Sequence, residues 1–156
     1  MIIRPAVKED LNTLAELTRD ALSFASSPDP YAWQLEDPAL KKRLESYLDS
    51  TKGSAFVLEV EGSIAGFVAS HFDEFDPRKP DKGAIIDLLA VEQQYRSQGF
   101  GTHLVRELLL RLPEQGITSI NVNVIGSSDS ALRFWRRVGF RELAVTMSVE
   151  LNPQTE

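Results

Sequence analysis

A glycine-containing segment in the second half of the chain has the residue types of a phosphate-binding loop. It runs from Arg96 to Thr102 in the order Arg-Ser-Gln-Gly-Phe-Gly-Thr, directly after the mostly apolar stretch Ile85–Val91. Such a stretch is typical of a buried strand, and the loop would open a helix, whose first N–H groups and dipole favour an anion. Gly99 and Gly101 allow a ligand close to the backbone, while the guanidinium of Arg96 suits phosphate.

Two better-known phosphate loops are excluded by the sequence. The chain has no G-x-x-x-x-G-K-[ST] segment, and no G-x-G-x-x-G segment followed by an acidic residue about 20 positions later. Nucleoside-triphosphate P-loops and Rossmann dinucleotide sites are therefore not expected. Considered alone, the loop from Arg96 to Thr102 has a second interpretation as a plain turn between a strand and a helix.

A carboxylate inside the apolar stretch is the best candidate for a catalytic base. Asp87 has Ile86 before it and Leu88 after it, and a carboxylate buried among apolar residues is typical of functional sites. The alternative is a structural aspartate that bonds to a neighbouring loop. Weaker base candidates are Glu59 and His71 on the adjacent predicted strands, whereas His103, on the helix after the loop, is expected near phosphate or solvent.

The spacing of apolar residues predicts the elements that would position these side chains. Alternation predicts strands, and apolar residues three or four apart predict helices. The expected order is strand, two helices, three strands, helix, strand, helix and strand, over residues 2–4, 8–22, 38–52, 56–60, 63–72, 84–91, 99–112, 120–124, 128–138 and 141–151. This order indicates an α+β fold around one mixed sheet.

Composition indicates one soluble domain over residues 1–156. Hydrophobic residues make up 42% of the chain and charged residues 26%, as in ordinary globular proteins. No apolar run approaches the roughly 20 residues of a membrane span, and the first five residues do not resemble a signal peptide. We therefore expect a cytoplasmic protein with no membrane partner. The lack of cysteine excludes disulfides, thiolate metal sites and a cysteine nucleophile.

The charge distribution is uneven along the chain. The net charge of −6 argues against a nucleic-acid partner. Residues 1–95 carry 10 Lys/Arg against 17 Asp/Glu, a net charge of −7, whereas residues 96–156 carry 7 against 6, a net charge of +1. This division suits an anionic cofactor and a cationic partner, although surface charge that is uneven without a functional reason explains it equally well.

Three segments together resemble the GNAT superfamily of acetyl-CoA-dependent N-acetyltransferases. Arg96–Gly101 is similar to the family's Q/R-x-x-G-x-G/A loop, and Ala131–Phe140 is similar to its N-x-x-A-x-x-F-Y-x-x-x-G-F block. Ile3–Leu11 resembles the family's first strand and helix. The segments span nearly the whole chain in the family's order. The resemblance implies a GNAT-like mixed, mostly antiparallel central sheet of about six strands flanked by about four helices.

The resemblance also implies a reaction and a cofactor site. The reaction is direct attack of a primary amine, on a small molecule or a peptide, on the thioester of acetyl-CoA, with no metal. Leu89 and Val91 would offer backbone groups to the pantetheine arm, and Ser128 stands where the family usually has an Asn. The implied cofactor-binding residues are Leu89, Ala90, Val91, Arg96, Ser97, Gln98, Gly99, Phe100, Gly101, Thr102 and Ser128.

Two positions depart from the family pattern. Trp135 occupies the place of the Tyr that many relatives use as the acid, and the N–H of an indole is a donor but not a useful acid. Asn123 stands where relatives that acetylate protein N-termini keep a Glu base. These departures leave open a catalytically weak or inactive module that binds acyl-CoA as a sensor.

The acceptor side is expected between the first two helices. That connection carries Phe24, Tyr31 and Trp33 among several carboxylates, a combination that suits a cationic amine. Anchoring of a loop onto the core is the alternative role for each of these aromatic residues. The short segment after the last helix leaves an open acceptor cleft, which a partner subunit in a homodimer could complete.

Overall fold

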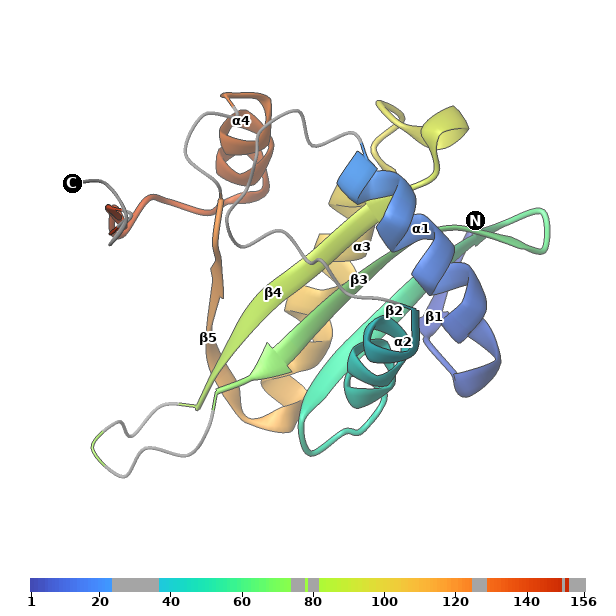
Figure 1. The fold of residues 1–156 in the computed structure, drawn as a ribbon, viewed down its shortest axis with the longest axis horizontal. Helices are drawn as coiled ribbons and strands as arrows, with labels where there is room; N and C mark the ends of the chain where they lie inside the picture. The colour runs from blue at the N-terminus through green and yellow to red at the C-terminus, as the bar shows by residue number, and fades with distance from the viewer. Residues whose placement is uncertain (24–36, 74–77, 79–81, 125–128, 150, 152–156) are drawn as a thin grey trace.

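A five-stranded sheet organises the chain (Figure 1). The computed structural model describes residues 1–23, 37–73, 78, 82–124, 129–149 and 151. The strands follow one another in sequence order across the sheet, with the first four antiparallel and the last pair parallel. They are β1 (Ile2–Pro5), β2 (Gly53–Val60), β3 (Ser63–Phe72), β4 (Lys82–Val91) and β5 (Ile117–Val122).

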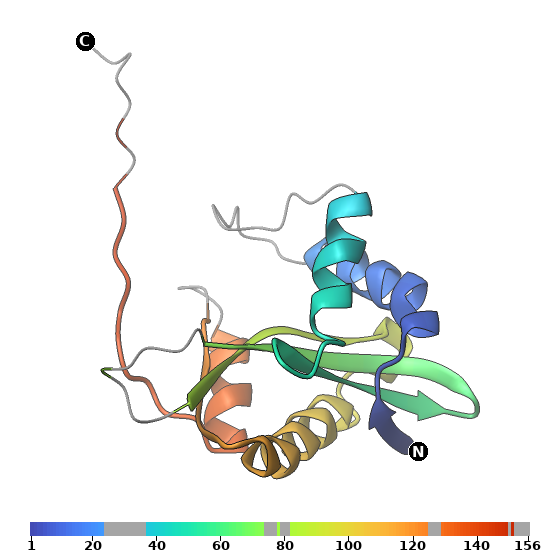
Figure 2. The same cartoon turned by 90° about the horizontal axis from the view of Figure 1, so that it is seen from below.

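Helices cover both faces of the sheet. Figure 2 shows α1 (Leu11–Ser23) and α2 (Asp37–Ser46) on one face, with α3 (Phe100–Arg111) and α4 (Asp129–Val138) on the other. Short 3-10 turns precede α1 at Lys8–Asp10, precede α3 at Gln93–Tyr95 and follow α3 at Leu112–Gln115. Within the described ranges, no helix has the length and apolar character needed to cross a bilayer.

The core consists of two apolar layers separated by the sheet. Along β2, Phe56 and Leu58 pack towards α3, whereas Ala55 and Val57 pack towards α1 and α2. Because successive side chains of a strand point to opposite faces, one strand supplies both layers. Full burial of a large apolar side chain contributes about 1.5–3 kcal/mol, so the central strands carry much of the stability.

The turn between β2 and β3 fixes the register of these two antiparallel strands. Glu61 and Gly62 have φ angles of 51° and 81°, and positive φ at both central residues is what a type I′ hairpin turn requires. The pair Val60↔Ser63 closes the hairpin. The predicted turn at Glu61-Gly62 and the predicted strand 63–72 are both confirmed.

The predicted fold class is confirmed, although several element bounds and the number of strands differ. The second helix ends at Ser46 rather than near residue 52, because residues 47–50 form turns. The strand expected at 120–124 lies at Ile117–Val122. The strand expected over 141–151 is wrong for the described residues in that range, which have no strand partner, so the sheet has five strands instead of about six.

A partly buried ion-pair network fixes the N-terminal strand. The guanidinium of Arg4 donates from Nη1 and Nη2 to the two carboxylate oxygens of Asp10 at 2.8 and 3.0 Å, and from Nε to Glu59 at 2.9 Å. Asp10 also accepts from the backbone N–H of Val7 at 2.8 Å and is only 6% exposed. The network joins β1 to β2 and to the start of α1. The hydrogen bonds from Arg4 hold the pKa of Asp10 below its ordinary value.

We expect Asp10→Asn to lower the free energy of unfolding at pH 7 by about 1–3 kcal/mol, because it removes a charged acceptor from a buried network. A carboxyl group with a lowered pKa stabilises the fold above its unfolded-state pKa, and this stabilisation is lost as the pH falls through the folded-state pKa. The difference in unfolding free energy between the variant and the unaltered chain should therefore shrink below about pH 3.8, the ordinary pKa of Asp. Urea titrations from pH 2.5 to 7 measure this, with exposed Glu9→Gln as the control; a deficit independent of pH would contradict the electrostatic explanation.

Candidate functional site

The two parallel strands separate halfway along β4. The β4–β5 ladder runs from Lys82↔Ile117 to Ile86↔Val122, whereas β4 itself continues to Val91. The last five residues of β4 thus have no strand partner on the β5 side within the described part of the chain. The carbonyl of Val91 already accepts a hydrogen bond from Nε of Arg96. The other backbone groups of this stretch are the ones that a ligand would meet, because backbone N–H and C=O groups need hydrogen-bond partners.

A β-bulge at Asp87 reverses the faces of β4. On the neighbouring β3, Ser70 pairs with Ile86 and Ala69 with Leu88, so Asp87 is an extra residue in β4. Before the bulge, Ala84 and Ile86 pack towards α3, whereas after it Leu88 packs towards α1 and α2, and Leu89 towards α3. Bulges redirect side chains in this way and are frequent beside active sites.

A cavity of about 440 Å³ opens at the start of α3, on the α3 face of the sheet. The described residues that line it include two guanidinium side chains and no carboxylate, which makes this part of the cavity electropositive. Arg96 is held in place by its Nε, which donates to the carbonyl oxygen of Val91 at 2.9 Å. The lining residues are Leu89, Val91, Tyr95, Arg96, Ser97, Gly99, Phe100, Gly101, Thr102, Phe134 and Arg137.

The backbone at this cavity is arranged as an anion site. Ser97 and Gly99 both have left-handed conformations, with φ angles of 62° and 84°. Gly99 caps α3, and the bond from the N–H of His103 to the carbonyl of Gly99 is the first of the helix. The N–H groups of Phe100 and the next two residues therefore precede the helical bonding pattern, and the helix dipole makes them attractive to anions.

Most of the predicted cofactor residues meet at this cavity. Ala90 is an exception, because it is 5% exposed and packs in the layer under α1 and α2. Gln98 does not line the cavity; its side-chain amide donates to the carbonyl of Gln94 at 3.0 Å. Ser128 lies outside the described residues.

Sequence reasoning missed Tyr95, Phe134 and Arg137 as lining residues. Phe134 has the helical spacing of a core residue and does pack against the core, yet it also borders the cavity. Arg137 comes from the last turn of α4. The sequence indicated its positive charge but not its place beside the cavity. Its position beside Arg96 depends on how α4 packs on α3, which no local pattern encodes.

Trp135 belongs to an aromatic cluster and does not line the cavity. The centroid of its ring lies 5.0 Å from the ring centroid of Phe134 and 5.1 Å from that of Phe140, and both contacts are edge-to-face. The backbone N–H of Phe140 also donates to the carbonyl of Trp135 at 2.9 Å. Such pairs stabilise packing by about 0.5–1.5 kcal/mol beyond area burial, so Trp135 anchors the end of α4.

A polar cluster occupies the opposite face of β4 at the bulge. One carboxylate oxygen of Asp87 accepts a hydrogen bond from the hydroxyl of Tyr47 at 2.8 Å and lies 2.6 Å from Nδ1 of His71. A guanidinium nitrogen of Arg43 is 3.8 Å from the same oxygen. The side chain of Asp87 is 12% exposed and that of His71 is 40% exposed. The cluster thus joins α2, the turn after it, β3 and β4.

The hydrogen bonds of the cluster define the role of each group. Burial, reinforced by the negative charge of Asp87, raises the pKa of Tyr47 above its ordinary value, so its hydroxyl stays protonated and donates. Because a carboxylate only accepts, Nδ1 of His71 carries the proton that faces Asp87. In the neutral imidazole, Nε2 then has a free lone pair. The pairing of His71 with Asp87 therefore forms an oriented proton acceptor.

The other candidates from the sequence lie elsewhere. Glu59 is occupied by Arg4 in the N-terminal network. His103 is exposed on α3, and Asn123 is exposed beyond the end of β5. The predicted acceptor residues Phe24, Tyr31 and Trp33 lie outside the described residues. Across the described ranges, no three His, Asp or Glu side chains are grouped as a metal site.

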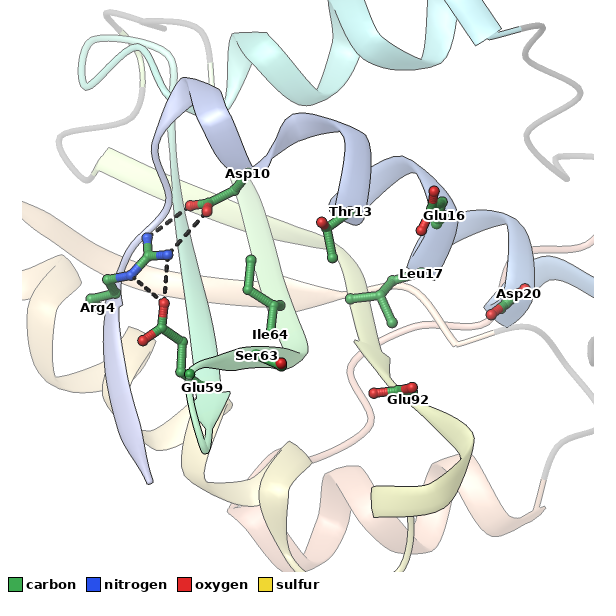
Figure 3. Close-up of a pocket in the computed structure, with 11 residues that line it drawn as sticks. Arg4, Asp10, Thr13, Glu16, Leu17, Asp20, Glu59, Ser63, Ile64 and Glu92 are labelled. Carbon is green, nitrogen blue, oxygen red and sulfur yellow. Dashed lines mark hydrogen bonds and ion pairs between the residues drawn. The ribbon is translucent and has the colours of Figure 1, made fainter.

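A second hollow, of about 470 Å³, lies between α1 and the start of β3 (Figure 3). Among the residues that the structure describes, its lining has five carboxylates and one guanidinium, that of Arg4, which is engaged by Asp10 and Glu59. Figure 3 shows the side chains of Glu16 and Asp20 along α1, with Glu92 at the end of β4 across from them. The hollow is acidic, in contrast to the cavity at α3.

Comparison with known proteins gives one family for most of the chain. The profile of the acetyltransferase (GNAT) family matches residues 14–140. Among curated relatives, mycothiol acetyltransferase from Rhodococcus jostii is 27% identical over 124 residues, which is 78% of this chain and 39% of the relative. An L-2,4-diaminobutyric acid acetyltransferase from Nocardia farcinica is 28% identical over 89 residues, 57% of this chain and 44% of the relative. The chain thus spans about two fifths of the length of these relatives.

Solved structures share the fold. The BH1408 protein of Bacillus halodurans, as a tetramutant, superposes with a TM-score of 0.81 at 21% identity, covering 97% of this chain and all of that one. An aminoglycoside acetyltransferase from an uncultured soil sample, in complex with sisomicin, gives a TM-score of 0.71 at 22% identity, covering 97% and 96%. The arrangement of sheet and helices is therefore shared with acetyltransferases of known structure.

The charge of the α3 cavity can be tested through Arg137. We expect Arg137→Ala to weaken CoA binding about 10- to 100-fold, because a charge-assisted hydrogen bond to phosphate contributes about 1.5–3 kcal/mol. Arg133→Ala, one turn earlier on the same face of α4 but outside the residues that line the cavity, is the matched control and should bind as the unaltered chain does. Isothermal calorimetry at two salt concentrations measures both. Equal affinities for the two variants would contradict the assignment of Arg137 to the cavity.

Proposed function

The chain belongs to the acetyltransferase (GNAT) family, and from that premise we propose that it transfers an acetyl group from acetyl-CoA to a primary amine. The observation that carries this proposal is the arrangement around β4. The cation-lined cavity lies on one face of that strand, the pair of His71 and Asp87 lies on the other, and the free backbone edge runs between them.

The residues of the α3 cavity fit the chemistry of CoA. Arg96, Arg137 and the amides that open α3 suit its phosphates. The backbone of Leu89 and Val91, on the edge of β4 without a strand partner among the described residues, suits the amides of the pantetheine arm. Bound acetyl-CoA would supply a thioester carbonyl for the amine to attack, with the CoA thiol as leaving group.

His71 is the proposed general base for the amine. Its Nε2 can take the proton that the attacking nitrogen must lose, while Asp87 fixes the ring through Nδ1 and stabilises the imidazolium that results. Tyr47 in turn holds Asp87 as a neutral donor. Sequence reasoning ranked Asp87 above His71 as the base, but the geometry favours His71 as the acceptor and Asp87 as the group that orients it, because His71 is the more exposed of the two.

Protonation of the leaving group needs no dedicated acid in this proposal. A thiol with an ordinary pKa near 8.5 leaves tolerably as thiolate at neutral pH. The indole of Trp135 at the usual Tyr position is consistent with this, since it is engaged in packing with Phe134 and Phe140. The proton taken by His71 is then available to the thiolate, which restores the base.

The proposed acceptor is a small cationic amine. Relatives are named for diaminobutyric acid and for aminoglycosides, both of which carry several amines. The acidic hollow beside α1 supplies negative potential on the same face of the sheet as His71 (Figure 3), and a cleft of one charge sign raises the local concentration of oppositely charged substrates. Peptidyl amines remain part of the proposal as larger acceptors.

The proposed base can be tested with the two histidines of the chain. We expect His71→Ala to lower kcat about 10²- to 10⁴-fold, the usual contribution of a positioned general base, with acetyl-CoA affinity unchanged. His103→Ala is the matched control, since that side chain is exposed on α3, and should keep its activity. Similar kcat values for the two variants would exclude His71 as the base.

The activity itself can be tested by calorimetry with acetyl-CoA, followed by thiol release with a panel of amines. Because the chain has no cysteine, every thiol detected comes from CoA. We expect micromolar binding and release with at least one diamine or aminoglycoside. Binding without release for any amine would favour the alternative function, a module that binds acyl-CoA without turnover, and the departures at Asn123 and Trp135 support that alternative. The absence of any binding would exclude both.

A further inference from the structure

Two glycines of the sheet lie directly opposite residues of the two halves of the site. Gly53, at the start of β2, pairs with His71 of β3, and Gly66 of β3 pairs with Val91 of β4. Side chains of directly paired residues lie side by side on one face of a sheet. Each glycine therefore places a position without a side chain beside a residue of the site, the proposed base in one case and a lining residue of the α3 cavity in the other.

The backbone conformation at these two positions does not require glycine. Neither Gly53 nor Gly66 has a positive φ angle, and both are buried. Glycine inside a strand weakens that strand, and it often marks a place where another part of the chain approaches closely. The property that these two residues contribute is therefore the space left by the missing β-carbon.

The space at Gly53 is occupied by the groups that support the proposed base. A β-carbon added there would lie 2.5 Å from the carbonyl oxygen of Ser70 and 3.3 Å from both Cα and Cδ1 of Tyr47. The carbonyl of Ser70 belongs to the peptide that leads into His71, and the hydroxyl of Tyr47 holds Asp87. An added methyl group would thus displace the backbone of the base and the ring that holds its partner.

The space at Gly66 is occupied by the two elements that border the α3 cavity. A β-carbon added there would lie 2.8 Å from the carbonyl oxygen of Ala90, and 3.3 Å from Cα of Val91 and from Cδ1 of Leu104. The carbonyl of Ala90 belongs to the peptide that leads into Val91, whose own carbonyl holds Arg96. Leu104 is fully buried in the second turn of α3. An added methyl group would thus displace the end of β4 and press on α3.

We propose that both glycines are positioning residues for the acetyl transfer, Gly53 for the base and Gly66 for the cofactor. The inference rests on the proposed function, because it assigns each glycine to one half of that site. Each acts through the backbone that packs against it, and a displacement of about 1 Å in a reacting group can cost roughly 10²-fold in rate. Gly66 and His71 are five residues apart on β3, roughly 16 Å at the rise of a strand, so the two effects are separable.

The cofactor half is tested by calorimetry with CoA. We expect Gly66→Ala to weaken CoA binding about 10- to 100-fold, because it displaces the β4 end that lines the cavity, and Gly53→Ala to bind as the unaltered chain does. Gly83→Ala, in β4, is the matched control. Its β-carbon would lie 2.4 Å from Oδ2 of the exposed Asp73 and 3.2 Å from Oγ of Ser119, so a side chain that can move takes up the closest contact. This control should also bind as the unaltered chain does.

The base half is tested by long-range ¹H–¹⁵N spectra, which report the ring nitrogen that carries the proton in each of the two histidines. At about pH 9, where an ordinary imidazole is neutral, we expect His71 of the unaltered chain to carry its proton on Nδ1, facing Asp87. Gly53→Ala should lose this preference, whereas Gly66→Ala and Gly83→Ala should keep it. The spectrum of His71→Ala assigns the signals. With the most active amine of the panel, kcat of Gly53→Ala at saturating acetyl-CoA should fall about 10-fold or more.

Equal CoA affinities for Gly66→Ala and Gly83→Ala would overturn the proposal, and so would an unchanged His71 tautomer in Gly53→Ala. Loss of both properties in either variant would also overturn it. Thermal unfolding accompanies each measurement, and a variant that does not fold would show that its glycine serves the core as a whole, which contradicts the proposal at that position. Failure of the proposed function gives a different result, because the unaltered chain itself would then bind no CoA or release no thiol.

Discussion

The arrangement of the site depends on one extra residue in the register between β3 and β4. Asp87 is not matched by a residue of β3, and the bulge that accommodates it puts Asp87 and Leu88 on the same face of the sheet. The following residue, Leu89, then faces the α3 cavity. Without the bulge, the alternation of β4 would direct Leu89 to the face of Asp87. One strand can thus serve both faces of the proposed reaction centre.

The two faces have opposite electrostatic character, and the sheet separates them. On the α3 side, Arg96 and Arg137 stand at the start of a helix whose dipole has the same sign. On the α1 side, carboxylates predominate and the polar cluster is built around Asp87. A fold that kept these charges on one face would neutralise them in mutual ion pairs, whereas separation keeps each set available to its own ligand.

Local patterns predicted the parts of this fold that local physics decides. The hairpin at Glu61-Gly62 and the helix that begins after Gly99 follow from positive-φ positions and apolar spacing. The sequence did not predict the bulge, because a strand buried on both faces has no alternation of polar and apolar residues that a bulge would interrupt. The contact between Tyr47 and Asp87 joins residues 40 positions apart, and Arg137 reaches the cavity only through helix packing. The strand expected over residues 141–151 is absent from the described residues of that range, because alternation contains no information about which strand would pair with it.

The bulge has a consequence for how such a site tolerates sequence change. The bulge depends on the number of residues in β4 and not on their types, because any amino acid at position 87 leaves β4 one residue longer than the stretch of β3 it faces. Substitutions can therefore alter the chemistry on the α2 side while the cofactor side keeps its orientation. Deletion of one residue from β4 would instead rotate Leu89 and Val91 out of the α3 cavity, even though every side chain of the site survived. Diversification of the proposed acceptor chemistry would in this sense be uncoupled from retention of the proposed cofactor site.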